Sequence, residues 1–432
     1  MSNTIDINVQ HMTRVEGHGN IVVKASDGTV EKVEWQVPEA PRFFEAMVRG
    51  RKWDEIQPIV ARICGICSVS HTLAAVKAVE NAMGIEVSEQ TQKIRHLLMN
   101  GEQLESHVLH VGYLVAPDLL GATSVVPLAT SHPTEVKTII EAHAVVTQIM
   151  EVIGGRMTHP ITCQPGGFKK LPTEADLLKL KEILVGVVPK LETIAGVVLS
   201  LADKIPAFER DTEYIALSDP SVYTFCDGLI NSTDIDQMVD PEQFESVVNE
   251  HVLAQSTAKW CKWHRDSYAV GALARFNLNS HQLMPLATKV AGMFGLEKGC
   301  CNPYMNSIAQ VVEAVQAVEH SLQIIEELLD SGITPEVPDV TPRAGNAAAA
   351  VEAPRGILFH RYQFDDDGVC QAGNICIPTG QNHANIQKDF ESLVPAFADQ
   401  GEDALRQLLE MLVRSYDPCI SCSTHYLDVE FV

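Results

Sequence analysis

The chain has 432 residues, of which 46% are hydrophobic and only 20% charged. This composition indicates a compact protein with a large buried core and excludes a disordered chain. Lysine and arginine total 32 against 56 acidic residues, for a net charge of -24. So acidic a surface repels polyanions, and we therefore expect no binding to nucleic acid or anionic membranes.

The sequence also bears on location. The most apolar stretch, residues 184–202, contains Pro189, Lys190 and Glu192, so it predicts a buried helix and no membrane span. Residues 1–19 lack the basic flank and apolar run of a secretion signal. A cytoplasmic location is therefore expected, and eleven cysteines there argue against a disulfide framework.

The predicted elements begin with strands. Residues 5–37 alternate polar and apolar side chains around Asp27-Gly28, which predicts a hairpin or small sheet. Helical periodicity follows from Trp53 onward, with helices expected over 136–153 and 308–328. Between them a helix should begin after Thr173, whose hydroxyl caps the first turn.

The last hundred residues mix types of element. A proline- and alanine-rich connection is expected over 333–356, then short strands at 357–364 and 369–378, then a helix at 402–415. The predicted fold class is mainly α with small β elements (α+β). We expect one intertwined helical body with small sheets at both ends of the chain.

Two cysteine pairs stand near opposite ends of the chain, Cys64 and Cys67 in RICGICSVSH and Cys419 and Cys422 in DPCISCSTH. Four thiols can form one sulfur-only metal site if the fold joins these ends. Structural zinc is the usual interpretation of two such pairs, but zinc ribbons place them roughly 15–20 residues apart. Spacing alone leaves zinc and another four-thiolate metal open. The other seven cysteines show no ligand spacing and are expected to be small buried hydrophobes.

The residues on either side of each cysteine pair are a more specific indication of the type of site. They fit R-x-C-G-x-C-x3-H and D-P-C-x-x-C-x-x-H, and TRVEGHG, FFEAMVRGR, SHVLH, GGRMTHP, EAPRG and IPTGQN occur in order around them. Across nearly the whole chain this pattern resembles the large, catalytic subunit of nickel–iron hydrogenases. The resemblance implies reversible cleavage of H2 to protons and electrons.

The resemblance also implies a set of ligands. All four cysteines would bind nickel, and Cys67 and Cys422 would bridge to iron in a Ni-Fe(CO)(CN)2 centre. Soft thiolates suit both metals. Cys419 would accept the proton released from H2, and Glu16 in TRVEGHG would relay it.

Further residues match the surroundings of that centre. Arg355 in EAPRG would lie over the metals in a polarising or positioning role, because its guanidinium does not release its proton. Asp118 and Asp417 would orient Arg355. Pro354 and Thr379 would line the pocket of the diatomic ligands. His71 is expected to support the metal ligands without binding a metal itself.

A second metal site is implied as well. Glu45 in FFEAMVRGR and His425 would hold Mg2+ or Fe2+, hard cations that suit oxygen ligands. The family's chains end at this histidine after cleavage, so residues 426–432 are interpreted as a removable extension. The domain would then span 1–425, with a small β portion over about 1–52.

Electron transfer requires partners, because no other cysteine set is spaced for an iron–sulfur cluster. The resemblance implies an iron–sulfur small subunit with further electron-transfer subunits, as in the cytoplasmic bidirectional branch, which serves NAD(P), the deazaflavin F420 or ferredoxin/heterodisulfide partners. A maturation endopeptidase and nickel-insertion factors are also implied. The alternatives are a zinc-stabilised non-redox scaffold, a hydrogen sensor and a complex I-type quinone-site subunit.

Overall fold

The computed structural model describes residues 4–26 and 29–424. The chain opens with an antiparallel sheet of β1 (Thr4–Val9), β2 (Asn20–Ser26) and β3 (Thr29–Gln36), in the order β1-β2-β3. The expected strands are therefore confirmed, while the Asp27-Gly28 turn lies outside the described residues. Trp35 anchors this sheet, because its indole N–H donates to Nδ1 of His383 at 2.9 Å on α13 (Pro378–Phe397).

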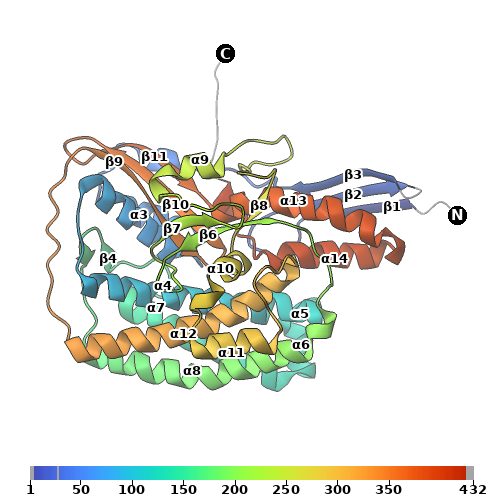
Figure 1. The fold of residues 1–432 in the computed structure, drawn as a ribbon, viewed down its shortest axis with the longest axis horizontal. Coiled ribbons are helices and arrows are strands. Elements are labelled where there is room, and N and C mark those ends of the chain that lie inside the picture. The colour runs from blue at the N-terminus through green and yellow to red at the C-terminus, as the bar shows by residue number, and fades with distance from the viewer. Residues whose placement is uncertain (1–3, 27–28, 425–432) are drawn as a thin grey trace, which may run out of the picture.

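Helices form the body of the molecule. Packed together in its lower half (Figure 1) are α4 (Glu89–Leu109), α7 (Pro133–Gly154), α8 (Glu174–Ser200), α11 (Pro285–Met293) and α12 (Asn306–Ser331). Helix α3 (Ser68–Met83) lies above them. The predictions for α7, α8 and α12 are confirmed. Thr173 and Asp176 form a capping box at the start of α8, each bonding the backbone N–H of the other.

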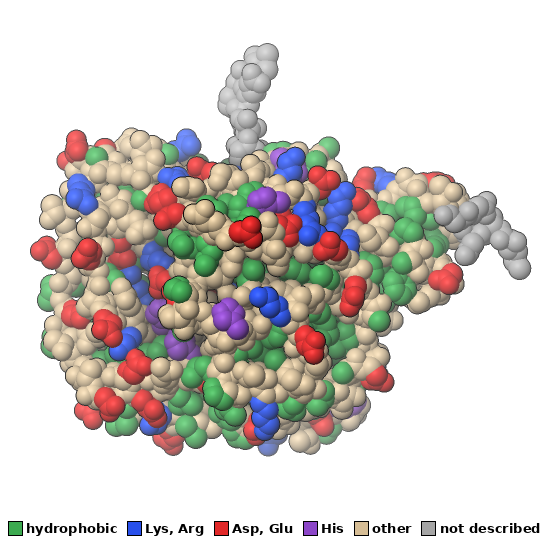
Figure 2. Space-filling model, viewed as in Figure 1, with side chains coloured by type: hydrophobic (Ala, Val, Ile, Leu, Met, Phe, Trp, Pro, Cys, Tyr) green, Lys and Arg blue, Asp and Glu red, His purple; other side chains and the backbone are tan. Residues whose placement is uncertain are grey.

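Helix α8 is more exposed than expected. Among the described residues it is the helix that is long and apolar enough to cross a membrane by length and composition, and about a third of its most apolar stretch is buried. It packs against α7 and α12, while Leu178 and Val185 face outward. Figure 2 shows hydrophobic side chains along the lower part of this face, where Figure 1 places α8 and α11.

A second antiparallel sheet has the order β11-β10-β9, with β9 (Gly345–Ala353), β10 (Gly356–Phe364) and β11 (Cys370–Cys376). The two expected strands are confirmed, but the predicted connection over 333–356 is wrong in its second half, which is β9. Alanine is poor in strands, yet here its small side chain lets α3 pack close. Asn81 and Lys77 of α3 donate to the carbonyls of Ala348 and Ala350.

A third sheet, order β7-β6-β8, lies in the middle of the chain and was not expected. It contains β6 (Glu213–Ser218), β7 (Leu229–Ser232) and β8 (Tyr268–Ala269). All six residues of β6 are buried, so the strand lacks the alternation by which a half-buried strand is recognised.

Shorter elements complete the fold. They are α1 (Phe44–Met47), α2 (Ile56–Val60), α5 (Ala116–Leu119), α6 (Val125–Ser131), β4 (Cys163–Gln164), β5 (Gly167–Phe168), α9 (Phe244–Val248), α10 (Ala272–Asn279) and α14 (Glu402–Ser415). Helix α14 confirms the last predicted helix and leads into the second cysteine pair. One hydrophobic cluster contains side chains from Ile5 in β1 to Cys422. The two ends of the chain therefore share a core, as expected for an intertwined unit.

Candidate metal centre

The four cysteines occupy two turns that meet in the interior. Cys64 follows a short 3-10 turn (Ala61–Ile63) in extended conformation, and Cys67 is the N-cap of α3. Cys419 and Cys422 lie in the turn after α14. Glu16 and Cys419 form an isolated parallel bridge, with Ile420 N–H donating to the Glu16 carbonyl at 2.9 Å. This pairing joins the first loop of the chain to the last.

The sulfur atoms of all four cysteines lie within 4.8 Å of one another. Cys64 Sγ is 3.6 Å from Cys419 Sγ, although 355 positions separate them. Each cysteine is at most 6% exposed. The sulfur atoms of Cys419 and Cys422 are in contact with each other. The predicted convergence of the two pairs is present in the fold.

The protein stabilises the thiolate form of Cys64. The thiol of Cys67, the charge of Arg355 and the backbone amides of Cys67 and Ile66 lower the pKa of Cys64 to about 7, against burial. The amides of Ile66 and Cys67 lie 3.3 and 3.2 Å from this sulfur. The pKa of Cys67 is raised, because its thiol donates to Cys64 and is buried. Thiolates are the form that binds metals.

Arg355 is 4% exposed and is held by one residue of the C-terminal turn. Its Nε donates to the Asp417 carbonyl at 2.6 Å and its Nη2 to Asp417 Oδ1 at 2.9 Å. Asp417 sits at a positive φ of 49° just before the second cysteine pair. Nη1 of Arg355 is buried and has no hydrogen-bond partner within residues 4–26 and 29–424. It is a donor available to a bound group.

Thr379 and Pro354 approach from two other elements. Thr379, in the first turn of α13, accepts a hydrogen bond of 3.0 Å from the amide of Cys419, which leaves its own O–H to donate elsewhere. Pro354 is buried in the turn between β9 and β10, next to Arg355. Its carbonyl accepts from Arg275 Nη2 at 3.1 Å.

Glu16 lies against the second cysteine turn. Its Oε2 accepts the amide of Ser421 at 3.1 Å, and its Oε1 accepts the Ser421 hydroxyl. Together with the backbone bridge to Cys419, this places the carboxylate beside the cysteine turn, where the sequence motif predicts it.

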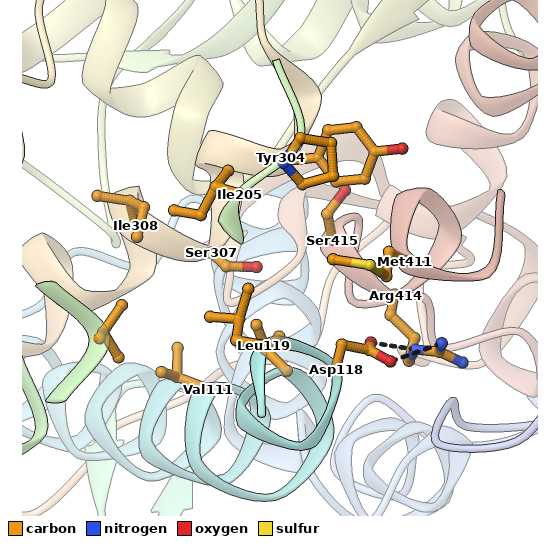
Figure 3. A pocket seen from close by; sticks show the side chains of 13 residues that line it. Val111, Asp118, Leu119, Ile205, Tyr304, Ser307, Ile308, Met411, Arg414 and Ser415 are labelled. Carbon is orange, nitrogen blue, oxygen red and sulfur yellow. Dashed lines mark hydrogen bonds and ion pairs between the residues drawn. The ribbon is translucent and has the colours of Figure 1, made fainter. Parts of the chain in front are cut away.

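The expectation that Asp118 lies beside Arg355 is corrected. Asp118 Oδ1 pairs with Arg14 Nη2 at 2.5 Å, and Oδ2 with Arg414 Nε at 2.6 Å. Figure 3 shows it turned toward Arg414 at the edge of a small cavity. A π-helical stretch, His110–Val115, precedes Asp118. Such a stretch changes the register of the helix, which the sequence motif does not reveal.

Two further predicted residues lie near the centre. His71, on α3, donates its backbone N–H to the Cys67 carbonyl at 3.2 Å and has Nδ1 3.1 Å from Nε2 of His360. Glu45, on α1, accepts the amide of Ile375 at 2.9 Å, and burial raises its pKa. Its expected partner His425, and the extension 426–432, lie outside the described residues.

Glu102 on α4 is a further residue near the centre that no sequence motif predicted. This carboxyl is fully buried and accepts the amides of Val69 and Ser70 at 2.6 and 2.9 Å, in the first turn of α3 directly after Cys67. Burial raises its pKa to about 8. The available signal was a glutamate four positions after Leu98, on the same helical face.

A second missed group is Arg275 on α10, whose side chain is fully buried. Its guanidinium pairs with Glu313 at 2.6 Å and Glu352 at 2.8 Å. It also donates to the carbonyls of Ala353 and Pro354. Arg275 therefore fixes the backbone immediately before Arg355. No local motif marks it, because its partners come from separate stretches of chain.

The donor set fits a soft transition metal. Four buried sulfurs suit nickel, iron or zinc. The partnerless Nη1 of Arg355, whose charge also acts on Cys64, provides a hydrogen-bond donor that a bare zinc–cysteine site does not need. The residues present are thus compatible with a metal that carries further ligands.

Comparisons with known proteins agree with this geometry. The family model described as nickel-dependent hydrogenase matches residues 42–141 and 228–425, and a HoxL-like model matches 6–40. The alpha chain of sulfhydrogenase 2 from Pyrococcus furiosus is 31% identical over 98% of this chain and 99% of its own. One subunit of the vhc F420-non-reducing hydrogenase from Methanococcus voltae is 29% identical over 98% of this chain and 96% of its own.

A solved structure shows the same fold. An NAD+-reducing [NiFe]-hydrogenase in the H2-reduced state superposes with a TM-score of 0.87 at 26% identity, over 97% of this chain and 99% of that one. These matches cover both cysteine pairs and leave the zinc scaffold and the quinone-site subunit without support. The chain belongs to the nickel-dependent hydrogenase family, as the large, catalytic subunit of a nickel–iron hydrogenase.

Proposed function

We propose that Cys64, Cys67, Cys419 and Cys422 would hold the nickel of this enzyme, and that Cys67 and Cys422 would also bind an iron carrying carbon monoxide and cyanide. The observation that carries the proposal is the meeting of four buried sulfurs from both ends of the chain within 4.8 Å. When bound, the centre supplies heterolytic cleavage of H2 and takes up the electrons.

Residues of this chain accept and transfer the proton released from H2. Cys419 Sγ accepts it, because a terminal thiolate is a base next to the reacting molecule. Glu16 receives it next, since its backbone pairs with Cys419 and its carboxylate is fixed by Ser421.

The remaining residues position the reactants. Asp417 fixes the guanidinium of Arg355 through two hydrogen bonds, which aims Nη1 as a charged donor. The Thr379 hydroxyl and the backbone at Pro354 form the pocket wall for the diatomic ligands. His71 supports the Cys67 turn from within α3. Asp118 has a different role, because its two arginine partners tie α5 to α14 and to the loop before Glu16.

Glu45 is proposed to hold a second cation, Mg2+ or Fe2+, together with His425. The partly buried carboxylate with a raised pKa supports this role, since a hard cation offsets the cost of desolvating its charge.

An iron–sulfur small subunit is proposed to dock beside the first cysteine turn. Four large apolar side chains there are 45–48% exposed: Phe43, Met47, Met157 and Ile161. The segments that carry them contact this turn, since Arg42 donates to the Ile63 carbonyl at 2.7 Å and the His159 amide donates to Ser68 Oγ at 3.0 Å. An electron acceptor seated there would be close to the metals.

Other features of the enzyme are proposed from the resemblance of the sequence motifs. Electrons would pass through further subunits to NAD(P), F420 or ferredoxin/heterodisulfide partners. Residues 426–432 would be removed by a maturation endopeptidase after nickel-insertion factors load the site, leaving a domain of residues 1–425. The enzyme would work in the cytoplasm.

The variant Cys419→Ser tests the central assignment. We expect loss of H2-dependent dye reduction and a lower nickel content, because a serine hydroxyl is a poor ligand for nickel. Cys163→Ser is the matched control, since Cys163 is also fully buried but lies outside the cluster. Undiminished turnover in Cys419→Ser would refute the assignment. Infrared bands of iron-bound carbon monoxide and cyanide test the diatomic ligands directly.

A further inference from the structure

A second group of metal-type ligands lies outside the four-cysteine centre. It consists of Glu250, Cys261 and Cys376, whose carboxylate oxygen and two sulfur atoms lie within 4.8 Å of one another. Cys261 is 0% exposed and Cys376 1%. No spacing rule connects these residues, because more than a hundred positions separate the two cysteines.

The backbone brings these ligands together. His251 and Trp260 exchange two N–H···O=C bonds of 2.8 Å, and Lys262 N–H donates to the Val248 carbonyl at 3.2 Å. These antiparallel bonds bring Glu250 close to Cys261. Cys376 is the last residue of β11 and pairs with Phe359 on β10. The ligands therefore sit on hydrogen-bonded segments and are positioned before any ion binds.

The charges around the cluster suit a divalent cation. Glu250 forms an ion pair of 2.6 Å with Lys259, one position before Trp260. Two thiolates and a carboxylate carry three negative charges, which a divalent cation and the Lys259 ammonium balance. Tyr268 is fully buried in the same hydrophobic cluster as both cysteines, and its hydroxyl donates to Gln381 Oε1 at 3.2 Å.

We propose that Glu250, Cys261 and Cys376 bind a zinc ion. Zinc takes thiolate and carboxylate ligands in tetrahedral sites, and a water molecule completes the fourth position. Binding forms two Zn–S bonds and one Zn–O bond to the carboxylate, while the hydrated ion keeps one water and loses the others; the two thiol protons pass to solvent, with no change of oxidation state. The ion joins the 250–261 segment to the end of β11.

This site differs in chemistry from the one proposed at Glu45. Glu45 accepts the amide of Ile375, the residue before Cys376, so the two sites are neighbours along β11. Oxygen ligands at Glu45 select a hard cation, whereas the two sulfurs select zinc. Zinc at the cysteines would fix the strand end on which the Glu45 site depends.

The test is metal analysis of the purified multi-subunit enzyme prepared under reducing, anaerobic conditions. We expect about one zinc per large subunit, lost in the double variant Cys261→Ser/Cys376→Ser while nickel stays bound. Cys370→Ser is the matched control, because Cys370 is buried at the other end of β11 and lies outside the cluster. It should keep its zinc.

A second variant tests zinc binding in case the double cysteine variant fails to fold. Glu250 is partly exposed, so Glu250→Gln should fold normally and weaken zinc binding at least about tenfold, the loss that even an outer partner of a metal ligand causes. Replacement of zinc by Co2+ should give a thiolate charge-transfer band that the double variant lacks. The proposal is overturned if the enzyme holds no zinc and takes none up from added Zn2+, or if alkylation and mass analysis find Cys261 and Cys376 joined as a disulfide.

Discussion

At the scale of single residues, Glu16 is the clearest test of proton transfer. Glu16→Gln keeps the shape and the acceptor for the Ser421 amide but removes the proton-carrying group. We expect turnover to fall by about 10²–10⁴-fold, the usual contribution of a general acid–base group. Nickel content and infrared bands should stay as in the unmodified enzyme, because Glu16 is not a ligand.

The control for this prediction is Glu39→Gln. Glu39 also lies beside the Glu16 loop, since its carboxylate accepts the amide of His18 at 2.7 Å. It has no bond to the second cysteine turn among the described residues. Comparable losses in both variants would show that charge in this loop matters rather than proton relay by Glu16.

Glu102 leads to a prediction about pH and stability. Its pKa is raised from 4.5 to about 8 by burial. Between these values the folded chain keeps a proton that the unfolded chain releases, so stability falls as pH rises, by up to about 1.4 kcal/mol per pH unit. Glu102→Gln should remove this part of the pH dependence, as measured by thermal unfolding at pH 5, 6, 7 and 8.

Glu182→Gln is the matched control, because Glu182 is exposed on α8. Its unfolding curves should follow those of the unmodified chain at every pH. If Glu102→Gln also follows them, the carboxyl of Glu102 is ionised in the folded protein and the predicted cost of its burial is absent.

At the scale of elements, the close contact of β9 with α3 leaves no room for a larger side chain at Gly345. A Cβ on Gly345 would lie 1.8 Å from the backbone oxygen of Ala82, so Gly345→Ala must push the strand from the helix. We expect a loss of about 1–3 kcal/mol of unfolding free energy, seen as a lower Tm.

Gly186 provides the matched control on α8, where a Cβ meets nothing within 4 Å. Gly186→Ala should raise stability by up to about 1 kcal/mol, because alanine favours the helix. Opposite Tm shifts for the same glycine-to-alanine change would separate the effect of packing from that of helix propensity. Equal Tm shifts in the two variants would contradict the role of the α3–β9 contact.

At the scale of the whole molecule, the exposed apolar side chains beside the first cysteine turn predict the subunit interface. Met157→Glu should weaken binding of the small subunit by at least about tenfold, as expected for a charge placed in an apolar interface. Co-purification and sedimentation measure the loss. Met293→Glu on α11 is the control, because Met293 is 44% exposed against 48% for Met157. Weakened association in Met293→Glu alone would place the interface elsewhere.

The candidate ligands and the helices α7, α8, α12 and α14 could be predicted from the order of residues. The two cysteines of each pair stay close together however the chain packs, because residues three positions apart are neighbours in a turn. This holds for Cys64 and Cys67 and for Cys419 and Cys422. Periodicity defined α7, α12 and α14, and in α7 and α14 a single buried face repeats every helical turn. Glu16 and Arg355 were found through short motifs, because each motif is continuous in sequence.

Features that depend on contacts between distant segments emerged only from the folded chain. The alanine run of β9 becomes a strand because α3 and β10 lie against it. Asp118 pairs with Arg14 and Arg414 instead of Arg355, and both arginines lie about a hundred or more positions away in the sequence. Glu102, Arg275 and the Glu250–Cys261–Cys376 cluster are defined by partners far away in sequence. Burial and charge pairing are properties of the packed chain, and no window of sequence contains them.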